Sequence, residues 1–185
     1  MVAALVIATL SGPQGPFHVA VTGDGVVAAE AGGDRQAFEH TLAARFRGLA
    51  EADTAARAAW RRLEPAIQKL VDGALRDVTV VPVDLRDRPD FDRRVLAAVR
   101  DVPWGDTASY AEIARRAGAP RAARAVGGAV RRCPISLIVP CHRIIASDGT
   151  LGGYGGDGDA DQRAALERKR WLLLREGVTV GSRVP

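Results

Sequence analysis

The residues with the most evident chemistry are Cys141 and His142, which adjoin in the run IVPCHRII at residues 138–145. A cysteine attacks as its thiolate, and an unperturbed thiol is mostly protonated at neutral pH. A neighbouring imidazole is a common means of removing that proton. The proline and apolar residues before Cys141 predict a buried strand that delivers the thiol to the edge of a pocket. The alternative is an inert core cysteine, because most buried cysteines have no chemical role.

Cysteine usage indicates free thiols and no structural metal. The chain has only two cysteines, Cys133 and Cys141, and neither belongs to a Cys-x-x-Cys pair or a Cys/His cluster with zinc spacing. We expect no metal and no cofactor. A reduced thiol is the expected state in a cytoplasmic protein, with a disulfide between the two cysteines as the alternative.

No apolar run approaches the roughly 20 residues that cross a bilayer, and no signal peptide is evident, so an intracellular protein without a membrane partner is expected.

Positive charge is concentrated in the second half of the chain. Residues 1–85 carry 8 basic and 10 acidic side chains, whereas residues 86–185 carry 18 and 12. Within residues 113–143 there is no acidic side chain and there are seven arginines: Arg115, Arg116, Arg121, Arg124, Arg131, Arg132 and Arg143. Such a local field attracts a polyanion such as DNA, although a solvated face is the alternative.

A segment of small residues, RAARAVGGAV at residues 121–130, has helical spacing. Two adjacent glycines inside a helix cost roughly 1 kcal/mol each relative to alanine, so such a sequence needs a reason. Small side chains permit close approach, either to a DNA groove or to a neighbouring helix. Arg124 projects from this surface as a long cationic side chain.

The first part of the chain, residues 1–84, is predicted to form an α/β (α+β) domain. Alternating apolar residues and turn signals predict strands at residues 2–10, 17–22, 26–30 and 78–83 and helices at residues 34–50 and 54–75. The first helix repeats Phe38, Leu42, Phe46 and Leu49 on one face. A small antiparallel sheet covered by helices follows from this pattern.

A second domain is predicted for residues 85–185, after a charged linker at residues 84–90. Helical patterns cover residues 91–100, 110–117, 121–130 and 162–176. A short turn at residues 118–120, which contains Gly118, joins the second and third of these, which suggests a helix-turn-helix. Residues 152–161 are so rich in glycine and aspartate that they must form a loop.

Five motifs in this order resemble the O6-alkylguanine-DNA alkyltransferases. They are SYAEIA at residues 109–114, AARAVGGA at 122–129, PCHR at 140–143, GGY at 152–154 and KRWLLLREG at 169–177. The resemblance is strong over residues 84–177, whereas residues 1–83 match only in length and in the order of elements. It implies a ribonuclease-H-like N-terminal domain and a C-terminal winged helix-turn-helix-like domain that carries the reactive cysteine.

The resemblance implies a single-turnover transfer in which Cys141 accepts an alkyl group from O6-alkylguanine, or from O4-alkylthymine, and keeps it as a thioether. His142 would take the thiol proton through a water molecule, and Glu176 would orient and polarise that histidine. From the residues alone, a carboxylate at the C-terminal end of a helix is unfavourable unless something holds it, and a plain solvated helix end is the alternative for Glu176.

The resemblance also implies that the damaged nucleotide is flipped out of duplex DNA. Arg124 would fill the gap, Tyr110 would push on the phosphate, and the helix at residues 121–130 would lie in the minor groove. The implied DNA contacts are Tyr110, Ala123, Arg124, Gly127 and Arg131. The implied substrate pocket consists of Tyr110, Pro140, Arg143, Ile144, Tyr154 and Gly155. The partner is double-stranded DNA containing alkylated bases, bound by a monomer, with cooperative binding as an open question.

Two features depart from the family pattern. Cys133 stands where the family usually has an asparagine that braces a turn, so Cys133 is either a replacement brace or a second reactive thiol. Residues 155–166 include an apparent insertion with Asp157, Asp159 and Asp161, which lacks the full ligand pattern of a calcium loop.

Two other functions are alternatives to alkyl transfer. One is a lesion sensor that binds without transfer, and the other is a cysteine hydrolase, for which no oxyanion hole is recognisable in the sequence.

Overall fold

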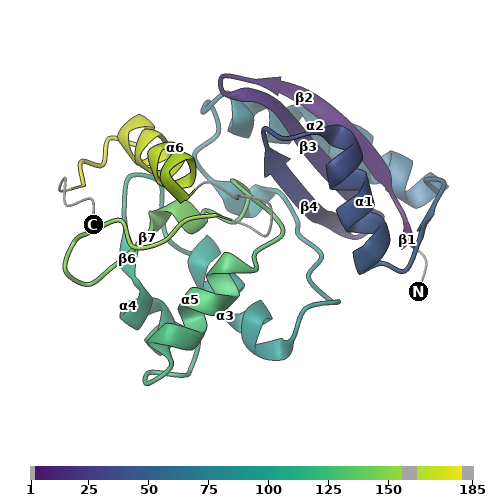
Figure 1. The fold of residues 1–185 in the computed structure, drawn as a ribbon. Coiled ribbons are helices and arrows are strands. Elements are labelled where there is room, and N and C mark those ends of the chain that lie inside the picture. Colours follow the sequence, from purple (N-terminus) through teal and green to yellow (C-terminus); the bar gives the residue numbers. More distant parts are fainter. Residues whose placement is uncertain (1–2, 156–161, 181–185) are drawn as a thin grey trace. The chain divides into compact units, whose positions relative to one another are not determined.

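The structure, a computed structural model, describes residues 3–155 and 162–180, which divide between two compact units (Figure 1). The first unit comprises Met1–Leu85 and Pro134–Ile138, and the second comprises Arg86–Cys133 and Val139–Pro185. The chain therefore leaves the first unit inside the charged segment at residues 84–90. Residues Pro134–Ile138 group with the first unit, although the predicted second domain includes them, because their backbone pairs with a strand of that unit: the amide of Ala29 donates to the carbonyl of Pro134 at 2.9 Å.

The first unit is built on a three-stranded antiparallel sheet, which confirms the predicted small antiparallel sheet. Its strands are β2 (Val6–Gly12), β3 (Gly15–Thr22) and β4 (Gly25–Ala31), hydrogen-bonded in that order. Two short strands, β1 (Ala3–Ala4) and β5 (Leu49–Ala50), pair in parallel beside it. Residues 17–21 of β3 and 25–29 of β4 are buried in unbroken runs, as expected for strand segments covered on both faces.

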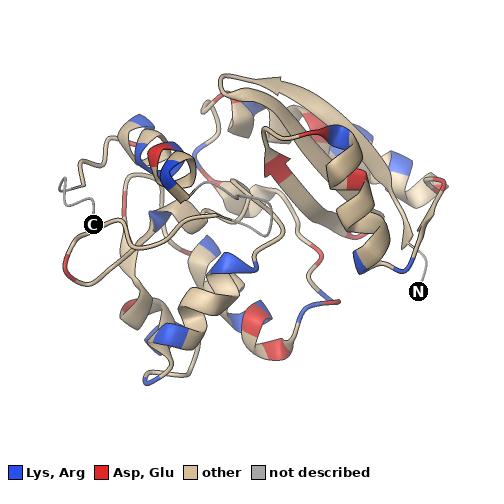
Figure 2. Ribbon diagram, in the orientation of Figure 1, with Lys and Arg blue, Asp and Glu red and all other residues tan. Residues whose placement is uncertain are grey.

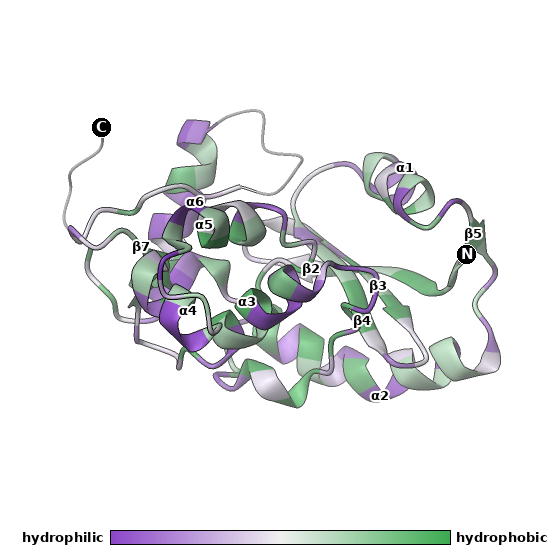
Figure 3. Cartoon of the chain, turned by 90° about the horizontal axis from the view of Figure 1, so that it is seen from below, coloured by the Kyte–Doolittle hydropathy of each residue, from purple (hydrophilic) through white to green (hydrophobic). Residues whose placement is uncertain are grey.

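Two helices cover this sheet, on opposite faces (Figures 1 and 3). Helix α1 (Arg35–Arg45) buries Phe38 and Leu42 against Leu5, Ala20 and Ala28. Helix α2 (Thr54–Val71) packs on β2 and β3. Each helix begins after an aspartate whose carboxylate accepts a hydrogen bond from a first-turn amide. The two predicted helices are thus present, and both are shorter than predicted.

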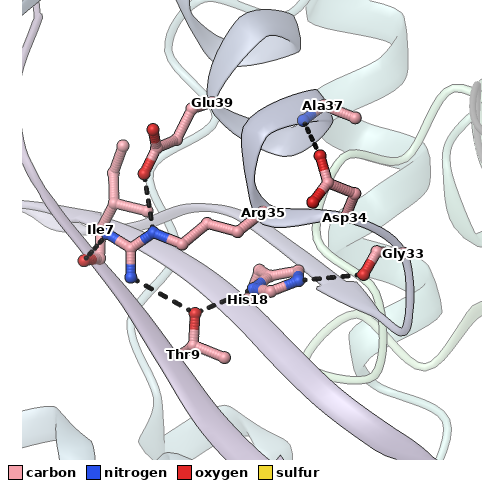
Figure 4. Close-up of polar contacts among 8 residues, drawn as sticks. All are labelled: Ile7, Thr9, His18, Gly33, Asp34, Arg35, Ala37 and Glu39. Carbon is pink, nitrogen blue, oxygen red and sulfur yellow. Dashed lines mark hydrogen bonds and ion pairs between the residues drawn. The ribbon is translucent and has the colours of Figure 1, made fainter.

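A network of polar contacts ties the start of α1 to the sheet (Figure 4). Arg35 donates to the carbonyl of Ile7 at 3.2 Å and to Thr9 Oγ1 at 3.4 Å. The buried ring of His18 lies 2.9 Å from Thr9 Oγ1 through Nδ1 and 3.4 Å from the carbonyl of Gly33 through Nε2. Both ring nitrogens of His18 have partners, so these contacts are part of the scaffold of this unit.

The predicted first helix continued to residue 50, whereas α1 ends at Arg45. Arg47 and Gly48 follow with φ of 54° and 115°, which a helix cannot accommodate and which glycine adopts readily. Leu49, whose spacing continues the apolar pattern of the helix, instead lies in β5. The left-handed backbone at Arg47 and Gly48 therefore ends the helix, although the apolar spacing continues to Leu49.

The predicted strand at residues 78–83 is wrong over most of its length. Residues Val78–Val80 form a short 3-10 helix, η1, and only Val83 makes an isolated bridge, to Val26. The carboxylate of Asp77 accepts hydrogen bonds from both the amide and the hydroxyl of Thr79, at 2.8 and 2.6 Å. This local cap competes with a strand ladder, although valines favour a strand.

The second unit is mainly helical, and its core is formed by three packed helices, α3 (Asp90–Arg100), α4 (Tyr110–Arg116) and α5 (Ala123–Arg131). Buried side chains at their centre are Val95, Leu96, Val99, Ile113, Ala114, Val126 and Ala129. Helix α6 (Gln162–Arg175) completes the unit. The described residues thus form a mixed α/β protein with six α-helices, and no helix among them is long and apolar enough to cross a membrane.

A pair of two-residue strands connects distant parts of the second unit. Strand β6 (Ala108–Ser109) pairs in parallel with β7 (Ile144–Ile145), with Ala108 opposite Ile144. Because β6 leads directly into α4, and β7 follows the Cys-His-Arg segment, this pairing brings Tyr110 beside that segment. It therefore assembles the candidate site from residues more than thirty positions apart in the sequence.

Candidate active site around Cys141

Cys141 begins a short 3-10 helix, η2 (Cys141–Arg143), rather than ending a strand. The predicted buried strand before it is wrong: in residues 134–140 the chain turns, and Leu137 adopts a φ of 67°. Ile138 and Val139 are buried as predicted, but they anchor a turn. An apolar run of this length does not distinguish a strand from a buried turn.

Cys141 is a partly exposed residue, and its thiol lies at the C-terminal end of α5. Its Sγ is 3.9 Å from the carbonyl oxygen of Val130, and it is hydrogen-bonded to the thiol of Cys133. The hydrogen bond with Cys133 and burial raise the pKa of the Cys141 thiol well above its ordinary value, and the nearby Lys169 ammonium only partly opposes this shift. The resting thiol is therefore protonated at neutral pH, so a reaction at sulfur needs a base.

His142 and Glu176 form a buried pair. His142 Nε2 lies 2.8 Å from Glu176 Oε1, and both side chains are almost inaccessible to solvent. Burial lowers the pKa of the His142 imidazole, although the hydrogen bond and the charge of Glu176 act in the opposite direction. The imidazole is therefore neutral at pH 7.

The contact with Glu176 determines which nitrogen of His142 is basic. An ionised carboxylate can only accept, so Nε2 carries the hydrogen, and the lone pair of the neutral ring lies on Nδ1. His142 Nδ1 is buried and has no hydrogen-bond partner among the described residues. An imidazole held in this tautomer by a carboxylate is ready to accept a proton at the opposite nitrogen.

Glu176 also binds Arg143, and this changes the place that we predicted for Arg143. Its guanidinium donates to Glu176 Oε2 at 2.9 Å and to Oε1 at 3.0 Å, and to the carbonyl of Val102 at 2.6 Å. Arg143 is 1% exposed, so this side chain lies behind His142 and does not line a pocket. Burial alone would raise the pKa of Glu176, but the hydrogen bonds from His142 and Arg143 outweigh it and lower the pKa.

Two other predicted pocket residues also face inward. Pro140 is buried and precedes η2, and its carbonyl accepts from the amide of Arg143 at 2.9 Å. The amide of Ile144 donates to the carbonyl of Cys141, and the carbonyl of Ile144 accepts from Lys169. The backbone of Ile144, predicted to contact substrate, is therefore already hydrogen-bonded within the protein.

Tyr110 forms the opposite side of the site, against the loop at residues 152–155. Its hydroxyl donates to the carbonyl of Gly153 at 3.3 Å. A Cβ on Gly152, whose φ is +65°, would lie 3.1 Å from the Tyr110 ring, so the loop and the ring are in close contact there. Burial and the nearby Cys141 raise the pKa of Tyr110, and the hydrogen bond to Gly153 opposes them. Tyr110 and Cys141 therefore lie in one local environment.

Lys169 is a central residue to which the sequence analysis gave no role. It is fully buried, and its ammonium donates to the carbonyls of Ile144, Leu151 and Gly153 at 2.5, 2.6 and 3.0 Å. It also lies over the ring of Tyr154, 5.8 Å from the centroid. Burial lowers the pKa of Lys169 to about 8, and the neighbouring Cys141 opposes that shift.

The sequence did contain a signal for Lys169. Ala165, Leu172 and Leu173 are buried residues of α6, and Lys169 falls on the same face at spacings of four, three and four positions. A lysine on the apolar face of a helix requires buried acceptors. That pattern marks residue 169 as a structural or functional position.

The predicted DNA-contacting residues lie on or beside α5. Arg124 and Arg131 are exposed, and Ala123 and Gly127 are partly exposed. Figure 2 shows that the charged segments of α5 are all basic. A Cβ added to Gly127 would lie 3.9 Å from the ring of Tyr110, an ordinary van der Waals contact, so this part of α5 lies against the tyrosine.

The end of α5 is fixed by a buried acid. Asp92, in α3, is 2% exposed and accepts from Arg132 through both carboxylate oxygens, at 2.9 and 3.2 Å. The carbonyl of Arg132 in turn accepts from Arg88 at 2.7 Å. These contacts hold the residue that immediately precedes Cys133.

The described residues contain no group of three or more His, Cys, Asp or Glu side chains that could hold a metal ion. Asp157, Asp159 and Asp161 of the predicted insertion lie outside the described residues. Gly155, predicted to contact the substrate, is the last described residue before them, with a φ of 129°.

The sequence of the second unit is similar to those of methylated-DNA methyltransferases. Residues 90–178 match the family model of the 6-O-methylguanine DNA methyltransferase DNA-binding domain. The methylated-DNA--protein-cysteine methyltransferase of Mycolicibacterium paratuberculosis is 51% identical over 96 residues, which cover 52% of this chain and 53% of that protein. The protein of the same name from Mus musculus is 46% identical over 92 residues, covering 49% and 40%. The sequence match thus spans about half the length, or less, of these curated relatives.

The similarity to solved structures extends over almost the whole chain. The O6-methylguanine methyltransferase of Mycobacterium tuberculosis is 32% identical with a TM-score of 0.68, covering 98% of this chain and 95% of that chain. A structure of Mycobacterium tuberculosis OGT in complex with DNA is 35% identical with a TM-score of 0.68, covering 91% and 90%. These matches include the first unit, in which the sequence patterns resemble the family only in the order of elements.

Proposed function

Because the chain belongs to the family of O6-alkylguanine-DNA alkyltransferases, we propose that it repairs alkylated guanine in duplex DNA by accepting the alkyl group on Cys141. The observation that carries this proposal is the buried Glu176–His142 pair, with Nε2 of the imidazole 2.8 Å from the carboxylate, directly behind the thiol-bearing residue. That pair supplies a neutral imidazole with its basic nitrogen free, beside a thiol that needs a base.

In the proposed reaction the sulfur of Cys141 attacks the alkyl carbon, forming a carbon–sulfur bond while the bond from that carbon to guanine O6 breaks. The thiol proton passes through a water molecule to His142 Nδ1, and the bond electrons return to the guanine, which takes up a proton. Glu176 stabilises the resulting imidazolium. The carbon–sulfur bond of the thioether is stable and no group of the proposed site cleaves it, so each molecule acts once.

The proposed DNA interface uses α4 and α5 as a winged helix-turn-helix, with the first unit as a ribonuclease-H-like domain. Helix α5 would enter the minor groove, where Ala123 and Gly127 allow close approach and Arg131 contacts the backbone. Arg124 would take the place of the flipped nucleotide, which would lie between Tyr110 and Tyr154. DNA as a partner is supported by the structure of the Mycobacterium tuberculosis relative in complex with DNA.

All proposed site residues come from one copy of the chain, so we propose a monomer; cooperative binding along DNA is a separate question. A reactive free thiol needs a reducing compartment, which supports a cytoplasmic location. Transfer from O4-alkylthymine belongs to the same proposal as a second substrate.

The proposal is tested by intact-mass measurement after mixing the protein with a duplex that contains one O6-methylguanine. We expect a gain of one methyl group per molecule, located on Cys141 by peptide mapping, and no gain with Cys141→Ser. Lesion binding without any mass gain would indicate a non-catalytic sensor. Repeated turnover on a small ester or amide would indicate a hydrolase.

Arg124→Ala is expected to slow transfer from duplex DNA roughly tenfold or more, because base flipping costs a few kcal/mol and nothing would fill the gap. Transfer from free O6-alkylguanine, which needs no flipping, should keep its rate. Arg163→Ala is a matched control, since this arginine is 88% exposed and lies on α6. Equal slowing on duplex and free base would place Arg124 outside the flipping step.

Gly152→Ala is expected to slow transfer on the order of tenfold, because the new Cβ would meet the Tyr110 ring at 3.1 Å and displace it. Gly149→Ala is the control: Gly149 has a similar φ of +80°, but a Cβ there meets nothing within 4 Å. Both variants bear the backbone strain, and only one moves Tyr110. Equal transfer rates for the two variants would show that the position of Tyr110 does not limit the reaction.

A further inference from the structure

We propose that Cys133 and Cys141 form a redox-active dithiol, which a hydroperoxide converts to a disulfide and which a thiol reductant restores. The modification would withdraw the acceptor sulfur reversibly from alkyl transfer. Formation of the disulfide stands on the geometry alone, and only its effect on transfer rests on the proposed function.

The two thiols share one small region at the end of α5. They are hydrogen-bonded to each other, and both cysteines are partly exposed. The carbonyl oxygen of Val130 accepts from the amide of Cys133 at 3.1 Å and lies 3.9 Å from Cys141 Sγ. A common backbone acceptor therefore holds the two residues together.

Cys133 is anchored on its N-terminal side. Arg132 is bound by the buried carboxylate of Asp92, and its carbonyl accepts from Arg88. The backbone of the second cysteine is also held, because the amide of Cys141 donates to the carbonyl of Val139 at 2.8 Å. The backbone on both sides of the two thiols is therefore held by hydrogen bonds, and a disulfide requires that the two cysteines lie close together.

The reaction proceeds in two balanced steps. The thiolate of Cys141 attacks a peroxide oxygen, the oxygen–oxygen bond breaks, and the products are a sulfenic acid and, for hydrogen peroxide, hydroxide. The Cys133 thiolate then attacks the sulfenic sulfur, which forms the disulfide and releases water after the sulfenate oxygen takes up a proton. Overall, two thiols are oxidised by two electrons and one peroxide is reduced.

Cys133 would thereby act as a resolving cysteine. Without it, a sulfenic acid on Cys141 can be oxidised further to a sulfinic acid, which ordinary thiol reductants do not reverse. The reversible route therefore depends on the second thiol at position 133. Because only a thiolate attacks a peroxide, disulfide formation should accelerate as the pH rises.

The test uses the reduced full-length chain, treated with a small excess of hydrogen peroxide and then with iodoacetamide. We expect an intact mass lower by two hydrogen atoms, no carbamidomethyl groups, and one linked peptide that contains both cysteines. Phosphine reduction should restore both free thiols. Wild-type protein that gains oxygen on Cys141 without linkage to Cys133 overturns the proposal.

Cys133→Ser and Cys133→Ala supply the matched comparison, each measured against its own reduced sample. Peroxide should abolish methyl acceptance in all three proteins, and reduction should restore it almost completely only in the wild type. Equal recovery in the variants contradicts a resolving role. If the reduced wild type forms the disulfide but never accepts a methyl group, the proposed function fails while the dithiol stands.

Discussion

Replacing Glu176 with glutamine is expected to slow alkyl transfer to Cys141 by at least about 100-fold, the usual contribution of a positioned general base. The carboxylate accepts from His142 Nε2 and so keeps the basic lone pair on Nδ1. A glutamine can present its NH2 group to the ring and stabilise the opposite tautomer. It also removes the charge that raises the pKa of His142, so the imidazole becomes a weaker base.

The same change is expected to lower the free energy of unfolding by about 3–5 kcal/mol, because it leaves the buried Arg143 guanidinium without its counter-ion. Burial raises the pKa of Glu176, but the hydrogen bonds from His142 and Arg143 lower it below 4.5 overall. Folding therefore favours the ionised carboxylate. Its stabilising contribution is complete above pH 4.5 and is lost as the pH falls through the lower, folded-state pKa.

Glu167→Gln is the control, since Glu167 lies on the same helix, is 70% exposed and pairs only weakly with Arg163. Single-turnover transfer rates and denaturant unfolding are measured for both variants. Glu167→Gln should transfer at about the wild-type rate, and its free energy of unfolding should lie within about 0.5 kcal/mol of that of the wild type. A Glu176→Gln protein that transfers at the wild-type rate would show that the carboxylate does not act on His142.

Most helices were predictable from the sequence because their apolar spacing and their caps agree. Ser109 before α4 is an example: its hydroxyl accepts from the amide of Glu112 at 3.1 Å, as a helix N-cap should. The strand at residues 78–83 and the strand before Cys141 failed where local hydrogen bonds, or a residue with positive φ, overrode valine and isoleucine propensity. Such competition depends on side-chain geometry, which periodicity does not contain.

The candidate site was predictable in its residues but not in its connections. Cys141, His142 and Glu176 were selected by motif, and the structure brings the last two into contact. The resemblance implied a place in the substrate pocket for Arg143, whereas its guanidinium is buried. His142 and Arg143, adjacent in η2, both reach the carboxylate of Glu176, a shared contact that the sequence does not show.

Lys169→Met is expected to lower the free energy of unfolding by about 3–5 kcal/mol, since the buried bonds to the carbonyls of Ile144 and Leu151 would be lost together with the bond to Gly153. Methionine is similar in length and apolar, so packing is largely kept while the hydrogen bonds from Nζ are lost. Lys69→Met makes the same substitution at an exposed residue of α2 and should have little effect. Denaturant unfolding of both variants measures the difference.

The pH dependence of the free energy of unfolding tests the buried charge of Lys169, in addition to its hydrogen bonds. Burial lowers the pKa of Lys169 from 10.5 to about 8, so between these values the unfolded chain binds more protons than the folded one. Stability due to this group should therefore rise with pH from about 8 to 10.5, and the rise should be absent in Lys169→Met. Cys141, whose pKa is raised by the Cys133 hydrogen bond and by burial, acts in the opposite direction at alkaline pH.

The comparison is therefore best made in a Cys141→Ser background, with and without Lys169→Met. A stability curve with the same slope in both proteins would mean that Lys169 keeps an ordinary pKa in the folded state. In the background that retains Cys141, removal of the ammonium should also raise the thiol pKa further and slow transfer, because Lys169 is the positive charge that favours the thiolate. Loss of stability without loss of transfer rate would assign Lys169 to the scaffold alone.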